Sequence, residues 1–114
     1  MELKESDIRQ LIGINYNDTI DPEIAERQLQ VILKGFNHLY NHSNFLYIAD
    51  EVGLGKTYIA LGIASLLRHF SDQPETYQDL ILVPRKNLQY KWLKDLNNFI
   101  KYNYLQRDNR VKTV

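Results

Sequence analysis

The sequence predicts a layered α/β protein in which a parallel sheet is flanked by helices. Two apolar segments, residues 45–49 and 80–84, have the length of buried strands. Each is followed by a longer segment in which apolar residues recur at helical spacing. A regular alternation of strand and helix is typical of a parallel sheet, whose strands are apolar throughout because helices cover both faces.

Three helices are expected from capping residues and periodicity. The first begins after Asp21, a suitable N-cap, with Pro22 at its first position. Its apolar face comprises Leu29, Ile32, Leu33, Phe36 and Leu39. A second apolar face comprises Ile59, Ile63, Leu66, Leu67 and Phe70. A third comprises Leu88, Trp92, Leu93, Leu96, Phe99 and Ile100. Residues 110–114, RVKTV, are expected to start another strand.

The composition indicates a globular chain with an uneven charge distribution. Of its 114 residues 44% are hydrophobic and 25% are charged, and the absence of cysteine excludes disulfides and thiolate metal sites. No apolar run is long enough to cross a bilayer, so we expect a cytoplasmic protein with no membrane partner. Residues 1–83 carry 6 basic against 12 acidic side chains, and residues 84–114 carry 8 against 2. The basic part either meets a polyanion or is a solvated, lysine-rich helix face.

A phosphate-binding loop is predicted at GLGKT, residues 53–57, because the segment joins a predicted strand to a predicted helix. Gly53 and Gly55 let the backbone approach phosphate oxygens, and the free amides at a helix start attract anions. Lys56 is expected to bind the terminal phosphates of ATP, and Thr57 offers its hydroxyl to Mg²⁺. A glycine-containing turn without a ligand is the other interpretation.

The longer segment ADEVGLGKT, residues 49–57, has an acidic residue where the first glycine of a phosphate loop is usual. It resembles motif I of the Swi/Snf-type branch of superfamily-two helicases, in particular bacterial translocases associated with RNA polymerase. The resemblance implies a P-loop NTPase fold of the RecA-like type, with an incomplete parallel sheet. It implies that Lys56 and Thr57 are catalytic and that Thr57 contacts Mg²⁺ through ATP. The implied ATP-binding residues are, in this segment, Asp50, Glu51, Val52, Gly53, Leu54, Gly55, Lys56 and Thr57, and, directly after it, Tyr58.

Residues 80–92 resemble motif Ia of the same family, an apolar strand, a proline and L-x-x-x-W on a helix. Pro84, Leu88 and Trp92 match that spacing. The resemblance implies that the turn contacts the backbone of a nucleic-acid strand, as cations and amides at a turn can do without reading bases. The candidates for this contact are Arg85, Lys86 and Asn87. Alternatively, the two cations are solvated, and Trp92 is expected to belong to the core.

Residues 26–36 resemble the segment upstream of motif I that supplies a glutamine to the edge of adenine. Gln28 is the best match and Gln30 the alternative, since an amide can donate and accept at once. A polar residue on a helix surface is the competing interpretation. His38 and His42 have a zinc-binding spacing but no third ligand, so we interpret them as exposed histidines near a helix end.

The predicted organisation is a lead-in, residues 1–20, followed by the first part of a helicase ATP-binding lobe, residues 21–114. Motif I covers 49–57 and motif Ia covers 80–92. No D-E-x-x segment follows residue 57, so the Mg²⁺-binding and water-activating carboxylates of the family are missing. We therefore expect a piece of a longer chain, with negligible hydrolysis alone and the remainder of a two-lobed helicase core as partner.

The expected function is ATP binding in a Swi/Snf-like ATPase whose hydrolysis of ATP drives movement on double-stranded DNA. One alternative is a helicase of another branch, such as the DEAD-like group, acting on RNA or DNA. Another is a non-catalytic interaction module that binds a partner through its basic C-terminal segment.

Overall fold

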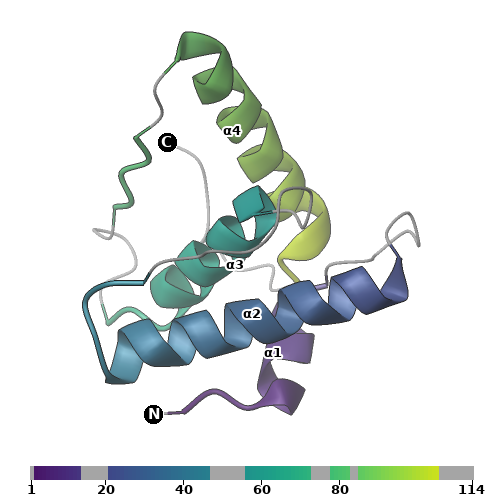
Figure 1. The fold of residues 1–114 in the computed structure, drawn as a ribbon, viewed down its shortest axis with the longest axis vertical. Helices are drawn as coiled ribbons and strands as arrows, with labels where there is room; N and C mark the ends of the chain where they lie inside the picture. Colours follow the sequence, from purple (N-terminus) through teal and green to yellow (C-terminus); the bar gives the residue numbers. More distant parts are fainter. Residues whose placement is uncertain (1, 14–20, 47–55, 73–77, 83–84, 106–114) are drawn as a thin grey trace.

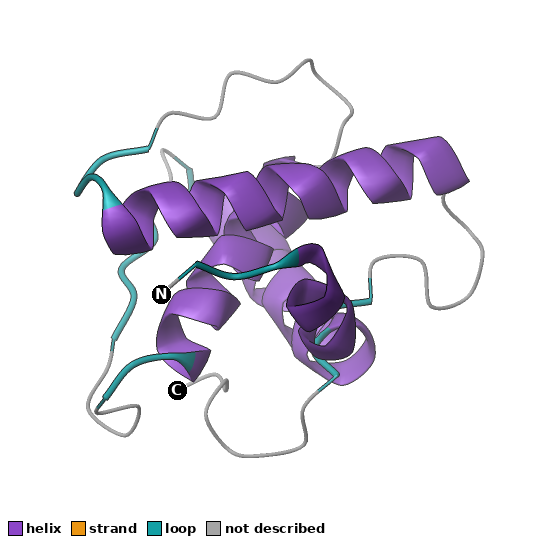
Figure 2. Cartoon of the chain, turned by 90° about the horizontal axis from the view of Figure 1, so that it is seen from below, coloured by secondary structure: helices purple, strands orange, loops and turns teal. Residues whose placement is uncertain are grey.

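The structure is a computed structural model that describes residues 2–13, 21–46, 56–72, 78–82 and 85–105. In this part of the chain the regular elements are all helical (Figures 1 and 2). They are α1 (Glu5–Leu11), α2 (Pro22–Asn41), α3 (Lys56–His69), α4 (Lys86–Asn98) and the π-helical turn η1 (Phe99–Asn103). Helix α2 contacts both α1 and α3, and α3 contacts α4. None of these helices combines the length and the hydropathy that a membrane crossing requires.

Helix α2 begins where its capping residues predict. Asp21 is the N-cap, and its Oδ1 accepts a hydrogen bond of 2.8 Å from the backbone N–H of Glu23. Pro22 occupies the first helical position, where its missing N–H costs nothing. Such a cap contributes about 1 kcal/mol to helix stability. The predicted first helix and its N-cap are confirmed.

The centre of the core is a close crossing of α2 and α3. A Cβ atom on Gly62 would lie 2.6 Å from Cδ1 of Ile32, and one on Gly35 would lie 2.7 Å from Cδ1 of Ile63. These two glycines therefore let the helix backbones approach to a separation that larger residues would prevent. The buried apolar side chains are Leu3, Ile8, Leu11, Ile12, Ala25, Leu29, Ile32, Phe36, Ile59, Leu61, Ile63, Leu66, Phe99 and Tyr104.

The predicted parallel sheet, and with it the RecA-like P-loop fold, is contradicted by the structure. The described residues contain no strand, and residues 45–46 and 80–82 are irregular. Leu80 and Leu82 are each 83% exposed, although the prediction places them in a buried strand. The rest of the two predicted strands, and residues 110–114, lie outside the described residues.

The physical reason lies in the packing of the helices. The apolar face of α2 packs directly on α3, so these two faces bury each other with no sheet layer between them. The described residues hold one isolated antiparallel bridge, between Ile12 and Tyr104. It is supported by the Asn103 side chain, whose Nδ2 donates to the carbonyl of Gly13 at 2.6 Å. This bridge joins the N-terminal segment to the end of η1.

The N-terminal segment, expected as a lead-in, contributes a helix to the core. Ile8 of α1 is fully buried and Leu11 is nearly so. The Asn37 side chain of α2 makes two hydrogen bonds to the backbone of Leu3, accepting from its N–H at 2.8 Å and donating to its carbonyl at 2.9 Å. The start of the chain is therefore fixed to α2.

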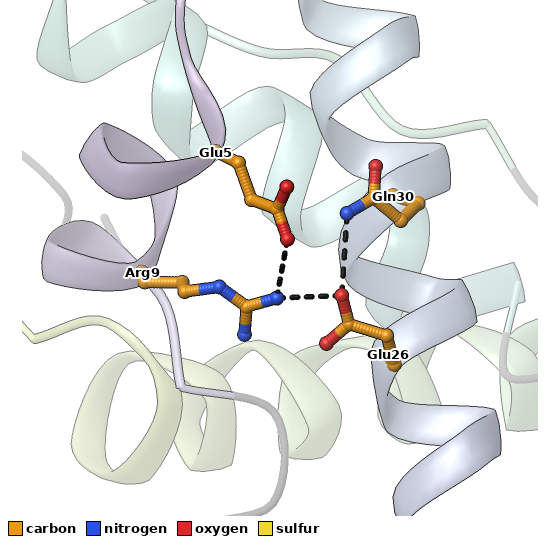
Figure 3. Close-up of polar contacts among 4 residues, drawn as sticks. All are labelled: Glu5, Arg9, Glu26 and Gln30. Carbon is orange, nitrogen blue, oxygen red and sulfur yellow. Dashed lines mark hydrogen bonds and ion pairs between the residues drawn. The ribbon is translucent and has the colours of Figure 1, made fainter.

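A polar network on the surface also joins α1 to α2 (Figure 3). Arg9 Nη2 donates to Glu5 Oε1 at 2.7 Å and to Glu26 Oε1 at 2.5 Å. Gln30 Nε2 donates to the same Glu26 oxygen at 3.2 Å. The hydrogen bond from Arg9, and then that from Gln30, lowers the pKa of Glu26 below its ordinary value. The network therefore favours the ionised carboxylate in the folded state.

We expect Arg9→Gln to lower the thermal unfolding midpoint slightly at pH 7 and to have no effect at low pH. Because the pKa of Glu26 is lower in the folded state, the stabilisation is present above the ordinary glutamate pKa of about 4.3. It is lost as the pH falls through the folded value, where the carboxylate takes up a proton. Unfolding midpoints of both proteins between pH 7 and pH 3 test this. A difference that grows on acidification would contradict the assignment.

Candidate nucleotide and nucleic-acid sites

Helix α3 begins at Lys56, directly after the glycine-rich segment, so the helix predicted at this point is confirmed. The first turn of α3 contains no acidic side chain. Its own residues therefore leave the partial positive charge of the helix start unopposed, which suits an anion. The six preceding candidates lie outside the described residues: Asp50, Glu51, Val52, Gly53, Leu54 and Gly55.

The next two candidates, Thr57 and Tyr58, are both half-buried in the first turn of α3. The Tyr58 ring lies 6.3 Å from the ring of Phe99, a fully buried residue at the start of η1. This contact anchors the start of α3 to the core. A hydroxyl is a ligand that Mg²⁺ accepts together with phosphate oxygens, so the residue type of Thr57 is compatible with an ion brought by ATP.

Gln28, the candidate for adenine, lies on the inward side of α2. Its side chain is buried, with 5% of the residue exposed, which does not match the interpretation as a surface residue. The alternative, Gln30, is half-buried and donates to Glu26 in the surface network. Both positions thus lie on α2, which packs against α3.

The candidates for nucleic-acid contact lie at the start of α4. Arg85 is the N-cap residue with an extended backbone, Lys86 is the first helical residue, and Asn87 is the second. All three are exposed. No side-chain hydrogen bond from Arg85 caps the helix. Cations beside a helix start are an arrangement that suits a phosphate group.

The structure does not bring the nucleotide and nucleic-acid candidates together. Phe99, which contacts Tyr58 near the start of α3, directly follows the last residue of α4. Helix α4 has 13 residues, which corresponds to about 20 Å at 1.5 Å per residue. Arg85 and Lys86, at the start of α4, therefore lie at the opposite end of this helix from that contact. Figure 1 shows the two ends of α4. Of the nucleotide candidates that the structure describes, Tyr58 therefore lies beside the end of α4 that is remote from Arg85 and Lys86.

Trp92 is half-buried and packs against the core, as predicted, but its helix is less buried than its apolar pattern indicates. Leu93, which belongs to the same predicted stripe, is 50% exposed. A shallow apolar groove of about 190 Å³ runs along this side of α4. It is lined by Ile81, Gln89, Trp92, Leu93 and Leu96.

The two histidines lie at the end of α2 with different surroundings. His38 Nε2 is 3.1 Å from the backbone carbonyl oxygen of Phe45. His42 is the C-cap residue, and its backbone N–H donates to the carbonyl of His38. Across the described ranges, no group of three acidic or histidine side chains is placed to hold a metal ion.

A family model described as the type III restriction enzyme res subunit matches residues 21–113, which is most of the chain. The chain belongs to this family, a helicase-like ATPase domain of superfamily two. ATPases of this kind bind nucleotide with Mg²⁺ and act with nucleic acid. The prediction of a superfamily-two, helicase-like ATPase is confirmed at that level. No curated protein and no solved structure matches the chain.

Proposed function

We propose that this chain is the nucleotide-binding part of a DNA-dependent ATPase of the Swi/Snf type, which moves on double-stranded DNA. The observation that carries the proposal is the start of α3 at Lys56, immediately after the glycines of ADEVGLGKT. Membership of a helicase-like family supports the ATPase activity, and the A-D-E-x-G-L-G-K-T form of the segment supports the branch. The protein then works in the cytoplasm, joined to the remainder of a two-lobed core.

Each candidate in the nucleotide site has a distinct task. The amides of 53–57 and the start of α3 bind phosphate oxygens, with Asp50, Glu51 and Val52 preceding them. Lys56 neutralises the terminal phosphates, and Thr57 orients the bound Mg²⁺. That ion, when bound, offsets negative charge on the β- and γ-phosphates. Gln28 contacts adenine, and its burial means that a base reaches the amide only if neighbouring side chains move.

Binding of a fluorescent ATP analogue, with and without polynucleotides of equal length, tests the proposal. Double-stranded DNA is expected to raise the affinity for the analogue, and RNA is not. Equal effects of the two would favour an RNA helicase of the DEAD-like group. Binding of a polynucleotide with no binding of the analogue would favour a non-catalytic module.

We expect Arg85→Gln combined with Lys86→Gln to weaken binding to duplex DNA without changing affinity for the ATP analogue. For B-DNA, each lost phosphate contact lowers the dependence of log K on log salt by about 0.9. The loss should be uniform over sequences, because phosphate contacts do not read bases. Anisotropy of a labelled duplex in a salt titration measures both quantities.

Lys91→Gln is the matched control for the double variant, because the Lys91 ammonium lies 3.1 Å from the carboxylate of Asp95 on the same helix. This variant should leave the salt dependence unchanged. A similar loss of duplex affinity in the control would show that general positive charge on α4, rather than the turn at its start, governs binding.

A further inference from the structure

The outward face of α4 carries a regular pattern beyond its first residue. Lys86, Tyr90 and Lys94 follow one another at intervals of four residues, which places their side chains on one face of a helix. All three are exposed, and Tyr90 is 64% exposed. At 1.5 Å per residue the two lysines lie about 12 Å apart along the axis with the tyrosine midway. We name these three residues the α4 stripe.

The surroundings leave the charge of the α4 stripe available to a ligand. In the described part of the chain no ion pair engages Lys86 or Lys94. The acidic residue of α4, Asp95, is instead paired with Lys91 on another side of the helix. The residues of α4 that face the core lie opposite the stripe, so Tyr90 is not needed for packing. They are Leu88, Trp92 and Leu96, all half-buried.

The chemistry of the α4 stripe distinguishes between three kinds of polyanion. A double-stranded nucleic acid offers phosphates to the lysines, but its bases are enclosed in the stack and cannot lie on Tyr90. An acidic peptide offers carboxylates, but a glutamate or aspartate has no planar ring to stack. A single strand offers both phosphates and unpaired bases, and stacking of bases on exposed aromatic rings beside cations is how such strands are held.

We propose that the α4 stripe binds single-stranded nucleic acid, with one base stacked on Tyr90 and flanking phosphates on Lys86 and Lys94. The inference rests on the proposed function, because Lys86 belongs to both sites. It extends that function by adding an unpaired stretch of a strand as a second ligand of α4, besides the duplex DNA contacted at Arg85 and Lys86. The strand then runs from the turn at Arg85 along the helix toward Lys94, on the face away from the core.

The test compares labelled oligo(dT) with a duplex of the same length by fluorescence anisotropy. Tyr90→Ala should weaken oligo(dT) binding by roughly 5- to 150-fold, the range for loss of one stacked base, and should leave duplex binding nearly unchanged. Tyr90→Phe keeps the ring and should bind oligo(dT) as the wild type does. For oligo(dT), Lys94→Gln should reduce the magnitude of the slope of log K against log salt concentration by about 0.7. Lys91→Gln should leave this slope unchanged.

The outcomes separate this inference from the proposed function. If the wild type binds the ATP analogue and duplex DNA but Tyr90→Ala leaves oligo(dT) binding unchanged, the α4 stripe is not a single-strand site and the proposed function stands. If neither the analogue nor the duplex binds, the proposed function fails. Equal losses for oligo(dT) and duplex in Tyr90→Ala would also overturn the stripe. Binding of polyglutamate at this face in place of oligo(dT) would overturn it too, because the ligand of the α4 stripe would then be an acidic peptide. Unchanged far-ultraviolet circular dichroism shows that the variants fold.

Discussion

Replacing Lys56 with alanine is expected to weaken binding of an ATP analogue by about 10- to 150-fold. The estimate follows from the 1.5–3 kcal/mol that a hydrogen bond to a charged group typically contributes. Lys56 is the first residue of α3, and a helix start favours anions. No other lysine or arginine occurs between residues 35 and 67. No neighbouring residue in this stretch of the sequence can therefore replace its charge.

Titration with a fluorescent ATP analogue, with Mg²⁺ present, measures the effect. Lys34→Ala is the matched control, because Lys34 is an exposed lysine on α2 outside the candidate site. Its affinity for the analogue should equal that of the wild type. Thr57→Ala should weaken binding of the analogue more when Mg²⁺ is present than when it is absent. Equal affinities of Lys56→Ala and Lys34→Ala would contradict the assignment of the phosphate loop.

The helices could be predicted because their signals are local. Asp21 and Pro22 define the start of α2 through one hydrogen bond and one fixed dihedral angle. In α3, Ile59, Ile63 and Leu66 recur at helical spacing and are all buried. Neighbours within one or two turns determine such features, so the sequence is sufficient to predict them.

The sheet could not be predicted reliably, because strand pairing is not local. An apolar run such as Leu80 to Leu82 satisfies the composition of a buried strand whether or not a partner strand exists. Here both leucines are exposed, and within the described residues neither takes part in a β-bridge. The short helix α1 is the opposite case. It has only 7 residues and two buried side chains, Ile8 and Leu11, so its periodicity is too short to recognise.

The sequence motif predicts which residue types the candidate site uses, but not how tertiary packing arranges them. The motif predicts Lys56 and Thr57 as phosphate and Mg²⁺ ligands from neighbouring residues alone, and this stays a prediction. The burial of Gln28 depends on how α2 packs, and the separation of Arg85 from α3 depends on which end of α4 contacts Tyr58. Both are consequences of tertiary packing.

The largest loss of stability is expected from Phe36→Ala. Phe36 is fully buried on α2, with its ring 5.3 Å from that of Tyr40 and 5.5 Å from that of Phe70. Its removal leaves a cavity beside the crossing of α2 and α3, where Gly35 and Gly62 already bring the backbones close and limit collapse. Substitutions of this type cost about 3–5 kcal/mol, a large share of the roughly 5–15 kcal/mol that stabilises a typical domain.

Urea unfolding followed by circular dichroism measures this loss, with Phe45→Ala as the matched control. Phe45 is 72% exposed, so the same substitution removes little buried area and should leave the midpoint nearly unchanged. For Phe36→Ala the midpoint should fall by roughly 2 M. A comparable fall in both variants would mean that Phe45 is as enclosed as Phe36. No fall in either would mean that the α2–α3 crossing is not the centre of the core, because removing a ring from a packed core cannot be neutral.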